Sequence, residues 1–577
     1  MAAHDATLTE ALVHLDTTWV GIRDSVLNDR HLLWIGSGIS RERFPALPEL
    51  LERLFNSLHT AQDPANPDCP YFKTAVEIVD DYSHVHGLDL RQPPVAWAPA
   101  LRAALFEELT NNYGKVLGKN VNTAGVSRNI PFDILTLDAT YSDPTVMPDA
   151  EHRFIALLMA EGAVTQIVTT NWDPLTERAH KALGVSPDPR VIACVAELDG
   201  AGGAAIIFKV HGCAERSMAE PMKYKKHMIA THHQITRWSI DPLFRPFFEK
   251  LRTLLRERPS IFVGISGQDF NLQSQCVAVS CDGPAIGFPP PRVTFSGVVG
   301  VPQREILQAI HGDNYAPNEA VINSAAALPL YGKPLFGALY VSLLLKKLNI
   351  ILGAGEAYFD SDEQRALARS GLVTLRDTLC ARFDAIAWAD RWRLLATELP
   401  AVVARLLELY RNQRLPAGAE NYTQLDSQNP EAMSANPNLS SLNLHWLALA
   451  LATLSAGAVG AWRLQASTAA DGSDGQLRVV TPAEETCIFL SRQGVSAVQE
   501  LERTGAIVTG SGRKVLLIYP VGSEPKSLRR HPGMVLPGGH PAIGPREVWF
   551  EDCARDYPTA SDLVTSLKQE ISAAHIL

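Results

Sequence analysis

Polar side chains that could take part in chemistry follow two apolar runs of this chain. The letters TTNWD, which include Asn171 and Asp173, come directly after VTQIV at 164–168, and His211 follows AIIFKV at 205–210. Histidine can act as a general base near neutral pH, and amide and carboxylate groups can orient a polar ligand. Asp173 also suits the cap of a helix, and a lone histidine is usually structural. Helix capping does not explain Asn171. Two interpretations of these residues therefore remain, a ligand-binding site and a purely structural turn.

Two glycines follow an earlier apolar run, LLWI. Gly36, Ser37, Gly38 and Ser40 lie in the sequence GSGIS, where glycines two residues apart allow a tight turn and close approach to a phosphate. The third glycine of the dinucleotide-binding motif would fall at Arg41 and is missing. A phosphate-binding loop and a tight structural turn therefore both remain open.

A fourth apolar run, IFVGI, ends in the same way. Gly264 lies in it, and Ser266 and Asp269 follow within the letters SGQD. Small residues followed by a hydroxyl, an amide and a carboxylate suit contacts with a polar ligand. We do not expect four successive apolar runs to end in such residues by chance.

The four runs predict the elements that must position these side chains. Each run is short and mostly apolar without strict alternation, which is typical of parallel strands buried on both faces. Helix-like stretches lie between them, including 48–58 and 241–258, whose apolar residues recur at helical spacing. The pattern predicts an α/β fold with a Rossmann-like open parallel sheet, in which ligands bind beyond the carboxyl ends of the strands.

The remainder of the 577 residues predicts two further regions. Residues 348–470 are expected to form a helical region with a long polar surface loop at 413–443, and 471–577 a small C-terminal α/β domain with strands near 486–490, 515–519 and 547–550 and a helix at 561–574. The apolar segment 445–462 is slightly short for a bilayer and rich in Ala, Gly and Ser, so a buried helix is expected.

Composition limits the classes of function. The net charge of −10 gives no general electrostatic attraction for nucleic acid, so no direct nucleic-acid binding is expected. None of the eight cysteines forms a C-x-x-C pair, which argues against a zinc ribbon and suits a reduced, cytoplasmic protein. The first residues lack the basic start and apolar core of a signal peptide, and no membrane association is expected.

The ordered motifs GSGIS (36–40), TTNWD (169–173), KVHG (209–212) and GISGQDFNL (264–272) resemble those of the sirtuin superfamily. The resemblance is closest to bacterial sirtuin-like NAD+ hydrolases of antiphage defence, and it covers roughly residues 16–347. It implies a catalytic domain over residues 1–347.

The resemblance also implies a role for each matched residue. Asn171 and Asp173 would face the nicotinamide ribose, and His211 would be the catalytic base. Ser266 and Asp269 would contact the adenosine half of NAD+ or order its loop. The other NAD+-binding positions would be Gly36, Ser37, Gly38, Ser40, Thr170 and Gly264.

Two departures from the sirtuin deacylases bear on the activity. The chain lacks their four zinc-binding cysteines, and it has Leu47-Pro48-Glu49-Leu50 where they continue with Pro-Asp-Phe-Arg. Both disfavour protein deacylation. The expected function is therefore cleavage of NAD+, as substrate and without a metal, by an effector of abortive infection. The alternatives are a non-catalytic module that binds NAD+ or ADP-ribose and gates a partner, and a deacylase or ADP-ribosyltransferase.

The resemblance implies partners as well. Sirtuin-like effectors often assemble, so a homo-oligomer is expected. Because an unregulated NAD+ hydrolase would poison its own cell, residues 348–577 are candidates for restraint, assembly or sensing of a phage-derived trigger or a defence partner protein.

Overall fold

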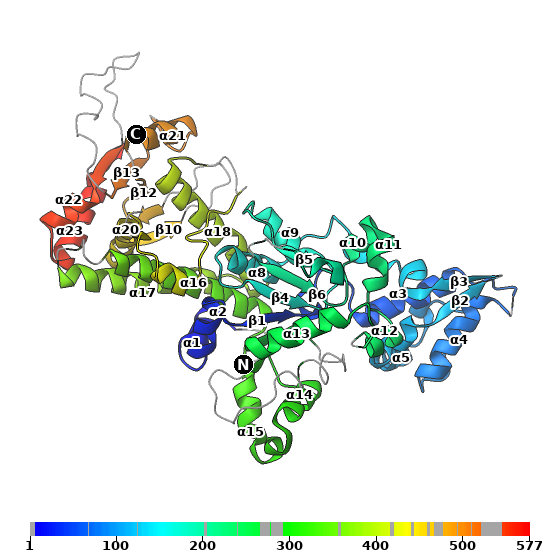
Figure 1. Ribbon diagram of the computed structural model, residues 1–577. Helices are drawn as coiled ribbons and strands as arrows, with labels where there is room; N and C mark the ends of the chain where they lie inside the picture. The colour runs from blue at the N-terminus through cyan, green and yellow to red at the C-terminus, as the bar shows by residue number, and fades with distance from the viewer. Residues whose placement is uncertain are drawn as a thin grey trace.

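The computed structural model gives one molecule in which a central sheet separates a helical lobe from a C-terminal half (Figure 1). The structure describes residues 6–66, 68–123, 125–200, 203, 205–238, 240–265, 277, 292–355, 359, 361–415, 421–439, 443–458, 462–466, 477–492, 494–508, 510–520 and 545–577.

The central sheet is parallel throughout and has the strand order β5-β6-β4-β1-β7-β8-β9. The four strands expected from the sequence are its four adjacent inner strands: β6 (Ile206–Lys209), β4 (Gln166–Thr169), β1 (Leu32–Ile35) and β7 (Ser260–Val263). Three outer strands were not predicted from the sequence: β5 (Arg190–Ile192), β8 (Val293–Ser296) and β9 (Ala327–Leu328). The Rossmann-like parallel sheet is confirmed.

Each inner strand is buried on both faces, which explains its continuous apolar character. Leu33 and Ile35 point into one core, while Leu32 and Trp34 point into the core on the opposite face. The first core is covered by α1 (Leu8–Asp16), α2 (Val20–Leu27), α8 (Ala150–Ala160), α9 (Leu175–Ala182) and α16 (Gly332–Ala354), and the second by α13 (Arg245–Glu257), α14 (Val301–His311) and α15 (Tyr315–Ala326).

A helical lobe with a core of its own is inserted between β1 and β4. It begins with α3 (Leu47–Thr60), where Pro48 occupies the first turn and five apolar residues from Leu50 to Leu58 share one buried face. The lobe continues with α4 (Pro70–Tyr82), α5 (Pro99–Asn111), α6 (Tyr113–Leu117), the hairpin of β2 (Asn120–Thr123) and β3 (Val126–Asn129), and α7 (Leu137–Ser142). Trp172, just beyond β4, packs against this lobe, so the lobe lies at the carboxyl edge of the sheet.

The C-terminal half combines long helices with a second sheet. Its helices are α17 (Asp362–Asp384), α18 (Trp388–Asn412), α19 (Pro430–Ser434) and α20 (Leu444–Gly457). The second sheet has the strand order β10 (Arg463–Ala466), β11 (Leu477–Val480), β12 (Glu485–Leu490), β13 (Lys514–Tyr519) and β14 (Arg546–Trp549). A further strand, β15 (His575–Ile576), pairs with β13. The helices of this unit are α21 (Gly494–Arg503), α22 (Phe550–Asp556) and α23 (Ala560–Ser572). The predicted helical region and small α/β unit are both present.

One hydrophobic core joins this half to the central sheet. The same cluster of buried residues contains Leu33 of β1, Leu339 of α16, Leu449 of α20 and Leu567 of α23. The helix α16 runs across the predicted boundary at residue 347 without a break. The bounds of the three predicted domains stay predictions.

The segment 413–443 differs from the expected surface loop where the structure describes it. Tyr422, Leu425 and Met433 are buried, and α19 lies within the segment. The hydroxyl of Tyr422 donates to Glu161 Oε1 at 2.5 Å, and the main-chain N–H of Leu425 donates to the same oxygen at 2.9 Å. This part of the segment therefore supplies partners for the buried Glu161 and Lys347, which the polar composition alone does not distinguish from exposure to solvent.

Helix α16 is the single helix among the described residues that is long and apolar enough to cross a bilayer. Most of that apolar stretch is buried inside the protein, and Lys347 within it pairs with Glu161 at 2.6 Å. These features are typical of the core helix of a folded domain. The shorter apolar helix α20 is buried as expected.

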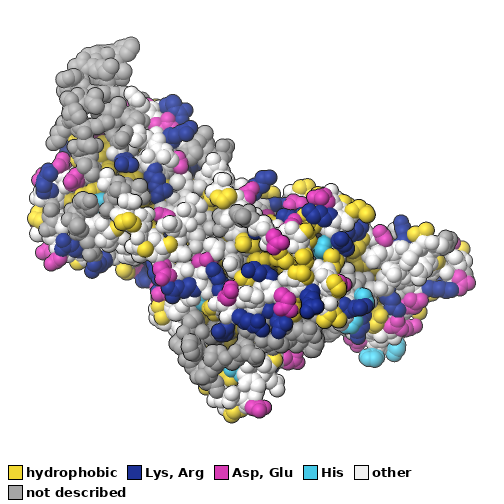
Figure 2. Space-filling model, in the orientation of Figure 1, with side chains coloured by type: hydrophobic (Ala, Val, Ile, Leu, Met, Phe, Trp, Pro, Cys, Tyr) yellow, Lys and Arg dark blue, Asp and Glu magenta, His cyan; other side chains and the backbone are white. Residues whose placement is uncertain are grey.

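Charged side chains of both signs are mixed over the face drawn in Figure 2. The outer face of α13, for example, carries Arg245, Lys250, Arg252 and Arg256 with Glu249 among them.

Candidate functional site

The predicted site residues that the structure describes follow β1, β4, β6 and β7 at their carboxyl ends, and these four strands are neighbours in the sheet. Thr169 of β4 is the register partner of Lys209 of β6, so Asn171 and His211 each lie two residues beyond a paired position. Asn171 is 6% exposed and His211 is 8% exposed. The structure therefore places both side chains at one edge of the sheet, on adjacent strands, next to the helical lobe.

The side chain of Asn171 is fixed by β1 and its following turn. Its amide nitrogen Nδ2 donates to the main-chain oxygen of Gly36 at 3.1 Å and to Ser40 Oγ at 3.2 Å. Its own main-chain N–H donates to Thr169 Oγ1 at 3.0 Å. Its carbonyl oxygen Oδ1 is buried and has no hydrogen-bond partner among the described residues. A buried acceptor of this kind is expected to have a partner in the working protein.

Ser40 connects Asn171 to His152, a histidine that was not among the predicted site residues. Ser40 Oγ lies 3.1 Å from Nε2 of His152, and both residues are buried. His152 lies in the first turn of α8, where its Nδ1 accepts the main-chain N–H of Asp149 at 3.2 Å. Burial lowers the pKa of His152 to about 4, so the ring is neutral near pH 7. The letters DAEH predict a helix start, but nothing local shows that this helix lies against Ser40.

His211 is positioned by the glycine that follows it. Gly212 has φ = +87°, and a Cβ atom there would lie 2.7 Å from the main-chain oxygen of His227. Only glycine adopts this turn without strain. The His211 ring packs edge-to-face with Trp238, with 6.2 Å between ring centroids. Trp238 follows α12 (His232–Arg237) and is 1% exposed, and its indole N–H has no hydrogen-bond partner among the described residues.

Asp173 is buried, and both its carboxylate and its main-chain oxygen accept hydrogen bonds. Its carboxylate Oδ1 accepts the main-chain N–H of Leu175 at 3.1 Å at the start of α9, close to the predicted capping role. The Nζ of Lys209 donates to the main-chain oxygen of Asp173 at 2.5 Å and to Glu177 Oε1 at 2.9 Å. Burial acts to lower the pKa of Lys209, but the acidic groups around it, Glu177 foremost, together raise that pKa above its ordinary value. Lys209 therefore stays charged and holds the turn that carries Asp173.

The glycines of GSGIS allow the turn after β1 to lie close to the turn after β7. A Cβ atom at Gly36 would lie 2.5 Å from the oxygen of Gly264, and one at Gly38 would lie 2.6 Å from the Cα of Gly264. Gly264 itself has φ = +69°. The amide of Gly36 donates to Val263 and that of Gly38 to Gly264. These two N–H groups are thus used within the protein, so the glycines act as spacers between β1 and β7 in this structure, and the phosphate-binding role of the loop stays a prediction.

The other predicted binding residues lie around this turn or outside the described residues. Ser37 is exposed, Ser40 is buried and Thr170 is half-buried. Ser266 and Asp269 lie outside the described residues, as does most of the motif GISGQDFNL.

An ion cluster lies behind His152. Lys333 of α16 contacts Asp149 Oδ2 at 3.1 Å and Glu42 Oε2 at 2.6 Å, and Arg43 contacts Asp149 Oδ1 at 3.0 Å. Burial acts to raise the pKa of Asp149, but the Ala150 N–H and the two cations lower it to about 2. Burial raises the pKa of the neighbouring Glu151 to about 8. At the start of α8, Asp149 is therefore charged and paired with Lys333 and Arg43, whereas His152 is neutral.

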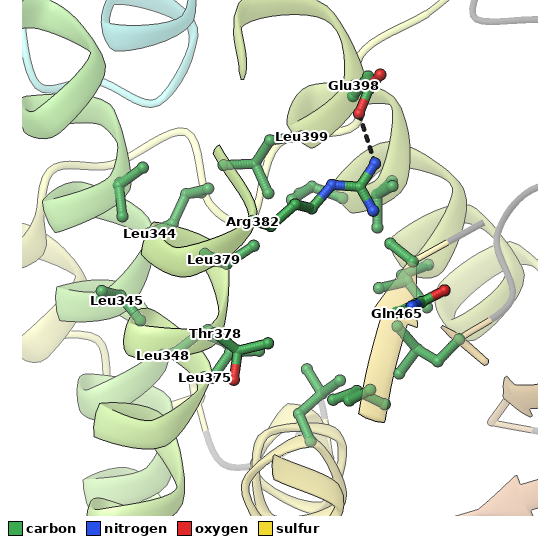
Figure 3. Close-up of a pocket in the computed structure, with 18 of the residues that line it drawn as sticks. Leu344, Leu345, Leu348, Leu375, Thr378, Leu379, Arg382, Glu398, Leu399 and Gln465 are labelled. Atoms are coloured by element: carbon green, nitrogen blue, oxygen red, sulfur yellow. Dashed lines mark hydrogen bonds and ion pairs between the residues drawn. The ribbon is translucent and has the colours of Figure 1, made fainter. Parts of the chain in front are cut away.

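A large apolar pocket lies elsewhere, in the C-terminal half. It has a volume of about 620 Å³ and is lined by α16, α17, α18, α20 and β10. Figure 3 shows leucines of α16 and α17 facing it, including Leu344 and Leu379, with the Arg382–Glu398 ion pair at one side. NAD+ carries two phosphates and two riboses, so a lining made chiefly of Leu and Val does not suit it. The polar residues at the strand ends are the better candidate site.

One comparison with known proteins covers part of the same sheet. The family model of the SIR2-like domain matches residues 165–298, a range that contains β4 to β8 and includes Asn171, His211 and Gly264. A search of curated proteins found no match to the chain. The match supports a sirtuin-like family. Because proteins with SIR2-like domains are usually NAD-dependent enzymes, it indicates an NAD-related activity.

Proposed function

We propose that this chain is an NAD+ glycohydrolase that cleaves the bond between nicotinamide and ribose. One observation carries the proposal: Asn171 and His211 follow adjacent parallel strands, and the buried Asn171 Oδ1 has no partner among the described residues. A binding module needs an acceptor for a ribose hydroxyl. It does not also need a histidine at the end of the adjacent strand that can take up a proton.

In the proposed reaction the glycosidic C–N bond breaks, and its electron pair stays on the nicotinamide nitrogen, which becomes neutral. The nicotinamide ring of NAD+ is already positively charged, so it can leave without being protonated by an acid. Positive charge develops on the ribose, as in other glycosyl cleavages. A water oxygen bonds to the sugar carbon and gives its proton to His211. The products are nicotinamide and ADP-ribose, or a cyclised ADP-ribose if a group of the same molecule attacks in place of water.

The described residues fit these needs. Asn171 Oδ1 would accept a hydrogen bond from a ribose hydroxyl or from the attacking water. The Asp173 carboxyl group lies at the same edge of the sheet, and because the Leu175 N–H donates to its Oδ1, we assign it stabilisation of the ribose cation rather than proton transfer. Trp238 backs the His211 ring and excludes water from one side.

Nicotinamide release from NAD+ by the purified full chain tests the proposal. The reaction is run with and without lysate of phage-infected cells. The variants Asn171→Ala and His211→Ala should each lower kcat by about 100- to 10,000-fold. His233→Ala, which removes an exposed histidine of α12, is the matched control and should leave kcat unchanged.

The outcomes separate the alternatives. Release that survives both site substitutions would show that the site is assigned wrongly. NAD+ binding without release under every condition would identify a non-catalytic NAD+- or ADP-ribose-binding module. Transfer of an acyl or ADP-ribosyl group to or from protein would identify the third alternative.

The cellular role is part of the same proposal. We propose that the protein is a cytoplasmic effector of abortive infection that works as a homo-oligomer. It would deplete NAD+ when a phage-derived trigger or a defence partner relieves its inhibition. The C-terminal half, which shares a core with the catalytic sheet, is the proposed place of restraint. Size-exclusion chromatography coupled to light scattering tests the oligomer directly.

A further inference from the structure

We propose that His152 is a positioning residue that acts through Ser40 to fix the amide of Asn171 for catalysis. The inference rests on the proposed function for its kinetic test. Its geometric basis, the contacts among these three side chains, can be tested without activity. No motif of the sequence analysis includes His152, and it lies on a helix that precedes β4 rather than at a strand end.

The hydrogen bonds of His152 determine its tautomer. Nδ1 accepts the main-chain N–H of Asp149 and so carries no proton. The pKa of about 4 keeps the ring neutral near pH 7, so its single proton lies on Nε2. Nε2–H therefore donates to Ser40 Oγ, 3.1 Å away.

The second donor to Ser40 is Asn171. The oxygen of Gly36 can only accept, so the Asn171 group that faces it must be the Nδ2 amide, and the second proton of the same nitrogen is directed at Ser40 Oγ. Ser40 thus accepts from His152 and from Asn171, and its own proton is left for a third group. Because Ser40 is 3% exposed, water does not substitute easily for either donor.

The consequence is a fixed direction for Asn171 Oδ1. With Nδ2 held by Gly36 and Ser40, Oδ1 is the amide atom that remains to meet a ligand. Loss of the His152 bond frees the Ser40 hydroxyl to rotate and weakens its hold on the amide. At metal sites, substitution of a residue that orients a ligand side chain typically costs about 10- to 100-fold in affinity or activity, and we expect a loss of that order here. We expect the loss chiefly in kcat, because His152 does not itself reach the ligand.

Two amide substitutions separate positioning from helix capping. In His152→Gln the side chain is long enough to place an N–H near Ser40 Oγ. In His152→Asn the shorter side chain retains an acceptor for the Asp149 N–H but does not reach Ser40. A positioning role predicts that Gln retains most of kcat and that Asn loses about 10- to 100-fold, with KM changed much less. A purely structural role predicts the reverse order, with the losses following the melting temperature.

A double-mutant cycle tests the path through Ser40. Ser40→Ala should lower kcat to a similar extent, and His152→Asn should lower it no further in that background. Independent, multiplying losses would overturn the inference.

A measurement without substrate keeps the inference testable if the chain releases no nicotinamide. In protein labelled with 15N-histidine, the His152 signal, identified by its absence in His152→Asn, should report a neutral Nε2–H ring near pH 7. That signal should shift in Ser40→Ala and not in the control His233→Ala. A ring protonated on Nδ1, or a signal unaffected by Ser40→Ala, would overturn the inference independently of the proposed function.

Discussion

At Gly212 a single hydrogen atom in place of a side chain determines where His211 points. The main chain there has φ = +87°, and a Cβ atom would meet the oxygen of His227 at 2.7 Å. We expect Gly212→Ala to lower the free energy of unfolding by about 1–3 kcal/mol and to reduce nicotinamide release, because the turn must shift to accept the methyl group. Chemical denaturation and the release assay measure the two effects.

Gly21 provides the control for this substitution. It lies in the exposed part of α2, and a Cβ atom there meets nothing within 4 Å. Gly21→Ala should raise the free energy of unfolding by about 0.5–1 kcal/mol through helix propensity and leave the release rate unchanged. If Gly212→Ala were as harmless as Gly21→Ala, the turn would not position His211.

The sequence predicted the side chains at strand ends and missed those that support them. Asn171 and His211 follow apolar runs, so their place at the edge of a parallel sheet follows from the strands alone. His152 lies on a helix and Trp238 directly follows one, and their contacts with Ser40 and His211 depend on how those helices pack. Side-chain pairs that are 112 residues apart, such as Ser40 and His152, leave no local pattern to recognise.

At the scale of elements, a buried ion pair joins α8 to α16. Lys347 and Glu161 are both fully buried, and Lys347 Nζ donates to Glu161 Oε2 at 2.6 Å and to the main-chain oxygen of Asp426. We expect Lys347→Met to lower the free energy of unfolding by about 3–5 kcal/mol, because it leaves the Glu161 carboxylate buried without its cation. Urea denaturation followed by tryptophan fluorescence measures the change.

The double variant Lys347→Met with Glu161→Gln tests that reason. A neutral amide can still accept from the Tyr422 hydroxyl and the Leu425 N–H, so at least half of the lost stability should return. No recovery would mean that packing around Lys347, rather than charge, accounts for the loss.

The elements themselves were predictable where the apolar pattern was long or fully buried. The four inner strands and the strands near 486–490, 515–519 and 547–550 were recognised within two residues of their bounds. The strands β5 and β9 have only three and two residues, which gives too little pattern to recognise. The strand β8 is as long as the inner strands, but its sequence VTFS alternates apolar and polar residues and so forms no apolar run. Of the helical lobe only α3 was predicted, because its amphipathic face is pronounced, whereas the others depend on packing within the lobe.

At the scale of the whole molecule, buried neutral histidines make stability sensitive to acid. Burial lowers the pKa of His31, His152 and His445 to about 4, from about 6.5 in the unfolded chain. As pH falls from 7 to 5 the unfolded chain takes up these protons and the folded chain does not, which costs about 2 kcal/mol per histidine. Glu151 acts in the opposite direction, since its raised pKa of about 8 favours the folded state as pH falls. The melting temperature should therefore fall from pH 7 to pH 5.

His31→Leu isolates one of these contributions. Neither ring nitrogen of His31 has a hydrogen-bond partner among the described residues, so an aliphatic side chain loses no such bond. The variant should melt at a higher temperature than the parent at pH 5 and at nearly the same temperature at pH 7. An equal shift at both pH values would assign the effect to packing instead of titration.

The uninterrupted course of α16 has a mechanical consequence. Its 23 residues form a rod about 34 Å long. At its start, Lys333 contacts Asp149, which leads through His152 and Ser40 to Asn171. Just beyond its far end, Gly355 lies against His445 of α20, with no room for a Cβ atom. A displacement of the C-terminal half would therefore pass along the hydrogen-bonded backbone of α16 and then through this chain of side-chain contacts to the proposed site.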